Sequence, residues 1–126
     1  MLQKLEQIAQ QIAGEIERGE IKVNGYVPLK NSLNQDNPYS GYCHAGVARF
    51  VELYGKEGVK VFSFTDASPD VFDRGRHMIA IVDGTIVDPT IRQYVANAKF
   101  VYAPEEKYLI KIMKNSWKEV NLNQLC

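Results

Sequence analysis

The sequence predicts an α+β domain in which helices pack on one antiparallel sheet. Three observations lead to this fold class: a regular apolar face near the N-terminus, a second apolar segment close to a cysteine, and a two-residue turn signal between two apolar runs. The 126 residues are enough for a single hydrophobic core, and we find no internal repeat. We therefore predict one domain over residues 1–126.

Apolar residues recur at steps of three and four near the N-terminus, at Leu2, Leu5, Ile8, Ile12 and Ile16. This spacing places them on one face and predicts a helix that ends near Arg18–Gly19. Residues 23–42 are rich in Asn, Gly, Pro and Ser, which predicts a long loop. A second helix is expected from about Ser40 or Gly41 to Tyr54, with Gly55 as its stop.

Strand signals dominate the second half of the chain. Residues 59–64 are β-branched and aromatic, which is typical of a buried strand. Residues 68–75 carry a Ser-Pro start and a Gly stop, so we expect one short helical turn there. Residues 77–90 contain Asp83-Gly84, a favoured two-residue hairpin turn, between two apolar runs.

Near the C-terminus the pattern predicts a third helix and a last strand. Pro104-Glu105-Glu106 resembles a helix start. Four residues then fall on one helical face: Tyr108, Leu109, Ile112 and Met113. Residues 116–122 are expected to add a short final strand.

Charge and composition bound the classes of partner. Fifteen basic side chains balance fifteen acidic ones, and nucleic acids or anionic membranes favour concentrated positive charge, so we expect neither partner. No apolar run reaches the ~18 residues of a bilayer span, and the amphipathic N-terminus does not resemble a signal peptide. Two cysteines are too few for a disulfide framework, and a bridge from Cys43 to the terminal Cys126 is not expected. We predict a cytoplasmic chain in the reduced state, without a cofactor.

The hairpin brings a histidine and an aspartate together. If Asp83 and Gly84 form the turn, Ile79 opposes Asp88, and His77 shares their face because side chains alternate with period two. His77 and Asp88 become diagonal neighbours, about 7–8 Å apart between backbones. Such a pair can fix the tautomer of an imidazole and stabilise its charged form.

Cys43 completes a candidate catalytic set with His77 and Asp88. It lies in the first turn of the predicted second helix, where the helix N-terminus stabilises a thiolate and supplies N–H groups for an oxyanion. Asn37 and Gln35, in the preceding loop, are candidate side-chain donors to the same oxyanion. Tyr42 could flank a substrate groove, although an aromatic residue beside a helix start often serves packing.

Three stretches carry Cys, His and Asp in this order: GYCHAGVARFVELYG (41–55), RHMIAIVDGT (76–85) and IVDPTIRQY (86–94). They resemble the papain-like and transglutaminase-like cysteine superfamily, whose core is a helix with Cys near its N-terminus followed by strands that carry His and then Asp or Asn. The resemblance covers roughly Asn37 to Tyr94. Small bacterial members, such as papain-fold toxin domains and glutamine deamidases, are most similar in size.

This resemblance implies an enzyme that acts on a peptide or side-chain amide. Cys43 is the expected nucleophile, His77 the proton carrier and Asp88 the group that orients His77. Proteolysis, deamidation and cross-linking all remain open as outcomes. The resemblance also implies a protein or peptide substrate and, for a toxin delivered into a target cell, an immunity or inhibitor protein as partner.

Two other interpretations of the same residues stay open. The chain could be a binding module that keeps the fold without activity, with Cys43 as a core residue and Asp88 as a turn former before Pro89. It could also bind a metal through Cys43, His44, His77 and Asp88, although paired local ligand spacing is missing. As a rival base His44 is less suited, because its helical position points about 100° away from Cys43.

Overall fold

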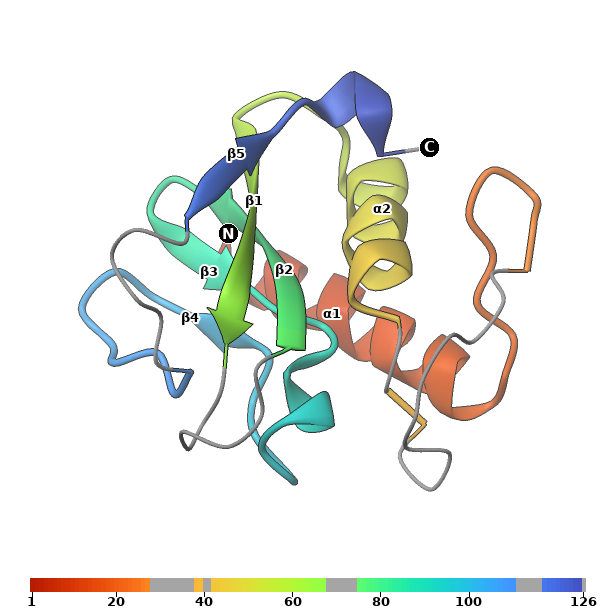
Figure 1. The fold of residues 1–126 in the computed structure, drawn as a ribbon, viewed down its shortest axis with the longest axis horizontal. Helices are drawn as coiled ribbons and strands as arrows, with labels where there is room; N and C mark the ends of the chain where they lie inside the picture. The colour runs from red at the N-terminus through yellow and green to blue at the C-terminus, as the bar shows by residue number, and fades with distance from the viewer. Residues whose placement is uncertain (28–37, 40–41, 68–74, 111–116, 126) are drawn as a thin grey trace.

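The computed structural model describes residues 1–27, 38–39, 42–67, 75–110 and 117–125. Within these residues two helices pack on a five-stranded antiparallel sheet (Figure 1), which confirms the predicted α+β class. The elements are α1 (Leu2–Glu17), α2 (Cys43–Tyr54), β1 (Val59–Ala67), β2 (Gly75–Val82), β3 (Thr85–Val87), β4 (Val101–Tyr102) and β5 (Lys118–Val120), with 3-10 turns η1 (Ile91–Gln93) and η2 (Leu122–Gln124). The strand order is β4-β3-β2-β1-β5.

The first helix forms where the apolar spacing predicts it. Of the predicted face, Leu5, Ile12 and Ile16 are buried together with Ala9 and Ala13, whereas Ile8 is only partly buried and Leu2, in the first turn, is 44% exposed. The helix ends at Glu17, and Gly19 then adopts a φ of 69°, a conformation that glycine reaches without steric cost. Both its position and its stop signal are therefore confirmed.

The second helix packs on α1 and on β2 (Figure 1). It begins at Cys43, while the predicted start at residues 40–41 lies outside the described residues. Phe50 is fully buried between these layers. Arg49 Nε and one terminal guanidinium nitrogen donate to the two carboxylate oxygens of Glu15, each at 3.0 Å, and this bidentate pair fixes α2 on α1.

The hairpin has the register that the sequence predicts. Val82 pairs with Thr85, and Ile81 and Ala80 pair with the next two residues of β3. Asp83 and Gly84 have φ values of 50° and 78°, as a two-residue turn of the mirror-image type requires. The alternation of faces along β2 and β3 is thereby confirmed.

The other predicted strands are present with different limits. The strand predicted at 59–64 extends to Ala67 and pairs with β2 and β5. Within the predicted strand 116–122, β5 occupies Lys118–Val120. The two-residue strand β4, which pairs with β3, was not predicted. The helical turn expected at 68–75 lies outside the described residues except for Gly75, which belongs to β2.

The helix predicted from Pro104 is wrong over its described part. Residues 103–106 form a turn, closed by a hydrogen bond from Glu106 N–H to Ala103 O and another from Ala103 N–H to Glu106 Oε1, both 3.0 Å. Beyond it the side chain of Leu109 is 48% exposed, while Ile110 is buried. Leu109 thus does not bury the face that a helix would have presented, because tertiary packing overrides a weak helical pattern. Ile112 and Met113 lie outside the described residues.

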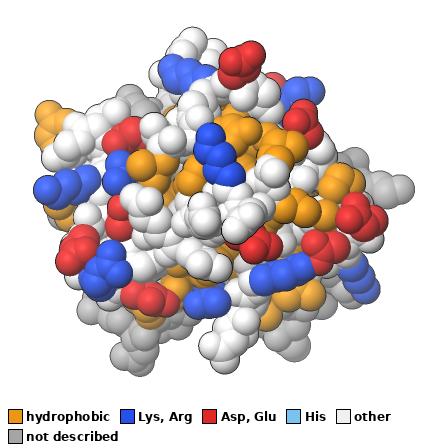
Figure 2. All heavy atoms as spheres, turned by 180° about the vertical axis from the view of Figure 1, so that it is seen from behind, with side chains coloured by type: hydrophobic (Ala, Val, Ile, Leu, Met, Phe, Trp, Pro, Cys, Tyr) orange, Lys and Arg blue, Asp and Glu red, His pale blue; other side chains and the backbone are white. Residues whose placement is uncertain are grey.

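The described surface mixes charges of both signs. On the face seen in Figure 2, Lys and Arg side chains lie among Asp and Glu side chains and form no continuous basic patch. None of the helices in the described ranges combines the length and apolar character needed to cross a bilayer.

Candidate active site

Cys43 is the first residue of α2 and its side chain is partly exposed. The preceding residue, Tyr42, is the N-cap, and its carbonyl accepts the Gly46 N–H at 2.7 Å. The Tyr42 side chain makes no capping hydrogen bond to the helix. The first N–H groups of α2 therefore remain uncapped by this residue and can bind an oxyanion next to the Cys43 sulfur.

The three other predicted substrate or oxyanion residues have different outcomes. Tyr42 lies directly beside Cys43, but it is half-buried and packs against the hydrophobic core. Asn37 and Gln35 lie outside the described residues. Of the predicted oxyanion donors, the structure therefore describes only the helix N-terminus.

His77 and Asp88 meet as the hairpin geometry predicts. His77 Nε2 lies 2.7 Å from Asp88 Oδ2, and both side chains are fully buried. His77 comes from β2, while Asp88 directly follows β3 and is fixed by its N–H, which donates to Phe100 O at 2.8 Å. Asp88 is therefore fixed by a backbone hydrogen bond as well as by the contacts of its carboxylate.

The imidazole also interacts with Cys43. Burial is the largest influence on the pKa of His77 and lowers it, because desolvation disfavours the imidazolium. The charge and hydrogen bond of Asp88, followed by a hydrogen bond and the charge of Cys43, outweigh burial and raise the pKa of His77 to about 9. His77 is therefore protonated at neutral pH, with a carboxylate on Nε2 and the Cys43 side chain within interaction distance.

The ring nitrogen that serves Cys43 follows from the other contacts. Nε2 is committed to Asp88, and Nδ1 is buried with no hydrogen-bond partner among the described residues. Nδ1 is thus the ring nitrogen that Asp88 does not occupy. The sequence predicted the three residues but not which nitrogen faces which partner.

Aromatic rings hold the imidazole from its edges. The ring centroids of Phe64 and Tyr94 lie 5.5 Å and 5.1 Å from that of His77, in edge-to-face geometry. Trp117 in turn packs on Phe64 at 5.1 Å. These contacts restrict rotation of the ring and keep water away from it, which strengthens its interactions with charged partners.

Tyr108 is a site residue that the sequence did not reveal. Its hydroxyl donates to Asp88 Oδ2, the same oxygen that His77 approaches. Burial, and then the charge of Asp88, raise the pKa of Tyr108 well above its usual value, so the hydroxyl remains a donor. No local motif marks this contact, because Tyr108 reaches the site from a segment whose pattern suggested a helix.

A close approach at Gly46 positions Cys43 against the hairpin. A Cβ at Gly46 would lie 2.9 Å from Thr90 Cγ2 and 3.5 Å from Pro89 Cγ, so only glycine fits without a shift. Pro89 and Thr90 directly follow Asp88 in the chain. The first turn of α2 therefore packs on the turn that carries the acid.

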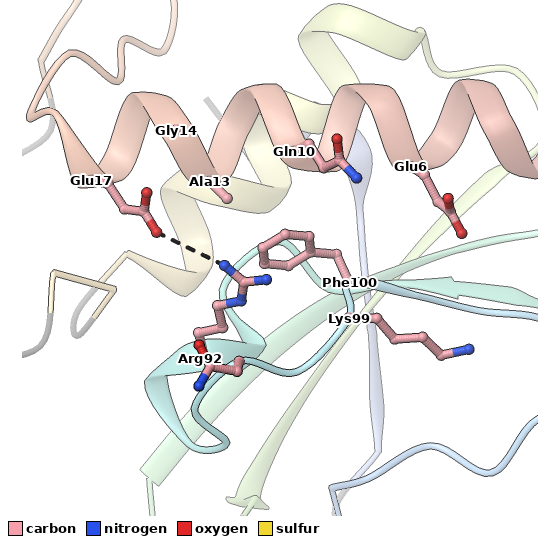
Figure 3. Close-up of a pocket in the computed structure, with 9 residues that line it drawn as sticks. Glu6, Gln10, Ala13, Gly14, Glu17, Arg92, Lys99 and Phe100 are labelled. Carbon is pink, nitrogen blue, oxygen red and sulfur yellow. Dashed lines mark ion pairs between the residues drawn. The ribbon is translucent and has the colours of Figure 1, made fainter.

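A second link joins the same two segments through α1. The Tyr39 hydroxyl donates to Glu17, and the Tyr39 carbonyl accepts the Tyr42 N–H at 3.2 Å. Burial and the hydrogen bond to Glu17 raise the pKa of Tyr39 to about 12, so this donor stays protonated. Glu17 also lies 4.0 Å from Arg92 in η1 (Figure 3). Glu17 thus connects the segment before Cys43 to the turn after Asp88.

Arg92 and Glu17 line a cavity of about 460 Å³ between α1 and the segment before β4 (Figure 3). The guanidinium of Arg92 lies over the Phe100 ring at 4.3 Å, and its Nε donates to Ala98 O at 3.0 Å. None of the described lining residues belongs to the set Cys43, His77 and Asp88. The cavity is therefore separate from the candidate active site.

The metal-binding interpretation would need several donor side chains close together. No group of three or more His, Cys, Asp or Glu side chains that could hold a metal occurs within the described residues. His44, the rival base, is exposed on α2.

No family model, curated protein or solved structure matches this chain. The arguments about function therefore depend on the geometry of the site.

Proposed function

We propose that this chain is a cysteine-dependent hydrolase or acyl-transfer enzyme that acts on a peptide or side-chain amide. The observation that carries the proposal is the environment of His77, a buried imidazole bonded to Asp88 and interacting with Cys43 at a helix N-terminus. An adjacent imidazolium and a helix N-terminus both favour the thiolate, the nucleophilic form of cysteine. The partial exposure of Cys43 gives a substrate access to the sulfur.

The proposed reaction begins with attack of the Cys43 thiolate on the amide carbonyl carbon. The C–S bond forms, and N–H groups at the start of α2 stabilise the oxyanion. His77 donates its proton to the leaving nitrogen as the C–N bond breaks, which leaves a thioester on Cys43. Asp88 keeps the imidazole oriented through Nε2.

The thioester is resolved by a second nucleophile. Neutral His77 takes a proton from water, the hydroxide oxygen attacks the thioester, and the C–S bond breaks to give a carboxylic acid and the thiolate–imidazolium pair. An amine in place of water gives a cross-linked amide. Hydrolysis of a backbone amide is proteolysis, and hydrolysis of a glutamine side chain is deamidation.

The same proposal assigns the chain to the papain-like and transglutaminase-like superfamily. What supports this assignment is the chain order Cys43, His77, Asp88 together with a helix–hairpin arrangement. The proposed substrate is a protein or peptide, and the proposed setting is the cytoplasm or a target cell that receives the chain as an effector. An immunity or inhibitor protein would then be its partner.

A labelling experiment tests the proposal. In a Cys126→Ala background, Cys43 is the only thiol, so iodoacetamide reports on it alone. At pH 6 an unassisted thiol is almost entirely protonated, and we expect Cys43 to react about 10–100-fold faster than such a thiol and His77→Ala to remove this advantage. Turnover of amide or peptide substrates should be lost in Cys43→Ala.

Two outcomes would contradict the enzyme. A labelling rate at pH 6 equal to that of an unassisted thiol, and unchanged by His77→Ala, would favour the inactive binding module. Tightly bound zinc by elemental analysis, lost in both Cys43→Ala and His77→Ala, would favour the metal-binding interpretation. His44→Ala is the matched control and should leave the labelling rate unchanged, because His44 is exposed.

A further inference from the structure

We propose that Tyr108 is a positioning residue of the candidate site: its hydroxyl shares Asp88 Oδ2 with His77 and so limits how tightly Asp88 holds the imidazolium. The inference rests on the proposed function, because it assigns a role within the same site. It goes beyond the Cys43, His77 and Asp88 set by adding a fourth side chain that acts through Asp88.

The contacts of Asp88 are unequal. Oδ2 accepts from both the Tyr108 hydroxyl and His77 Nε2, whereas Oδ1 is buried and has no hydrogen-bond partner among the described residues. Both donors therefore compete for the electron density of one oxygen. A carboxylate oxygen that accepts a second strong hydrogen bond binds the first donor less tightly.

The position of Tyr108 is fixed by packing as well as by this hydrogen bond. Its ring centroid lies 5.3 Å from that of Tyr102, whose own hydroxyl donates to Lys99 O at 2.8 Å. Tyr102 thus has a similar ring in the same cluster but a hydroxyl that is committed elsewhere. Tyr102→Phe is therefore a matched control for Tyr108→Phe, because it removes the same hydroxyl group from a neighbouring ring.

The surroundings of His77 define what Tyr108 can change. Asp88 and Cys43 are the leading charged partners of His77, and the ring of Tyr94 lies at its edge. Tyr108 reaches this set only through Asp88. Loss of the Tyr108 hydroxyl therefore leaves more of the Asp88 charge for the imidazolium, and the proton on His77 is held more strongly.

This arrangement matters for the leaving-group step. The imidazolium must give its proton to the departing nitrogen, and an acid that is held too strongly by its carboxylate is a poor donor. Tyr108 keeps the Asp88–His77 bond geometrically fixed while weakening its hold on the proton. The hydroxyl stays protonated at working pH, so this effect does not vary with pH.

The test is an NMR titration of His77 in Tyr108→Phe and in Tyr102→Phe. Both are made in a His44→Ala background, which leaves His77 as the only imidazole in the chain. We expect Tyr108→Phe to raise the titration midpoint of His77 by about 0.5–1 pH unit, since it removes a competing hydrogen bond to a charged group. Tyr102→Phe should leave the midpoint within about 0.2 pH unit, because the Tyr102 hydroxyl donates to Lys99 O and makes no hydrogen bond to Asp88, although it lies near the Asp88 charge.

A merely structural role for Tyr108 predicts lower stability without a change in the His77 midpoint. An unchanged or lower midpoint in Tyr108→Phe, or an equal shift in Tyr102→Phe, would overturn the inference. If Tyr108→Phe does not fold, 3-fluorotyrosine at position 108 keeps the ring and donates a stronger hydrogen bond. The midpoint should then fall, and a rise or no change would overturn the inference.

The same samples separate this inference from the proposed enzyme. Labelling of Cys43 with iodoacetamide and turnover of amide substrates test the enzyme. The His77 midpoint tests the Tyr108 contact whether or not turnover occurs. A shifted His77 midpoint in a protein whose Cys43 is unreactive would contradict the proposed function but still support the contact of Tyr108 with Asp88.

Discussion

Asp88→Asn should release the proton that His77 holds at neutral pH. The substitution keeps the shape of the side chain but removes its charge. The charge and hydrogen bond of Asp88 are the leading causes that raise the pKa of His77 to about 9, and burial opposes them. Each pKa unit corresponds to about 1.4 kcal/mol, so the rise from 6.5 to about 9 represents about 3 kcal/mol of stabilisation of the imidazolium.

The direct assay is the NMR titration of His77 in a His44→Ala background. We expect a midpoint near 9 with Asp88 present. With Asn at position 88, burial dominates, and the midpoint should fall to about 6.5 or below. An amide spectrum that is otherwise unchanged would show that the fold has survived.

The same titration predicts how stability depends on pH. The folded-state pKa of His77 is raised above its unfolded value, so its contribution is complete below pH 6.5 and is lost as the pH rises through 9. Urea unfolding should therefore show a free energy of unfolding that falls by up to about 3 kcal/mol across this window, and much less in Asp88→Asn. A midpoint near 6.5 with Asp88 present, or equal pH dependence in both proteins, would refute the reasoning.

Three further substitutions test how the site is positioned. Gly46→Ala should reduce stability by about 1–3 kcal/mol in urea and slow thiol labelling, because its Cβ would meet Thr90 Cγ2 at 2.9 Å; an unchanged labelling rate would count against this contact as the thiol's support. Gly84→Ala should lower the free energy of unfolding by about 1 kcal/mol in the same assay, because the φ of Gly84 is 78°, and should leave the labelling rate unchanged. A wild-type free energy of unfolding would contradict this prediction. Tyr39→Phe should lower the free energy of unfolding by about 1 kcal/mol through loss of its hydrogen bond to Glu17. This effect should shrink in a Glu17→Ala background, which lacks the acceptor, and an undiminished effect there would contradict the assignment.

The register of the hairpin was predictable because the turn type and the alternation of side chains leave few possible strand pairings. Asp83-Gly84 selects a two-residue turn, and period-two alternation then determines every pair up to Asp88. His77 and Asp88 are only 11 residues apart, so their contact follows from this local geometry. The N-terminal helix was predictable for a similar reason, since its spacing is regular and its stop is a glycine.

The C-terminal segment was not predictable from its own pattern. Pro104 followed by two glutamates favours a helix start, yet residues 103–106 close a turn instead. Tyr108 lies 20 residues from Asp88, and its contact depends on how the segment after β4 packs. Local sequence carries no signal for such a contact, because long-range packing decides it.

One part of the candidate site, the His77–Asp88 pair, depends on local hairpin geometry, and the other part, Cys43, depends on how α2 packs. The His77–Asp88 pair is set by the hairpin, whereas Cys43 reaches it only when α2 packs on the sheet. That docking uses the contact between Gly46 and Thr90, so the turn that follows Asp88 also supports the first turn of α2, which carries Cys43. A bulkier side chain at Gly46 should therefore displace the thiol while the 2.7 Å His77–Asp88 bond persists. In the titration this variant should lose only the Cys43 contribution to the His77 midpoint. This distinguishes a displaced Cys43 side chain from a broken His77–Asp88 hydrogen bond.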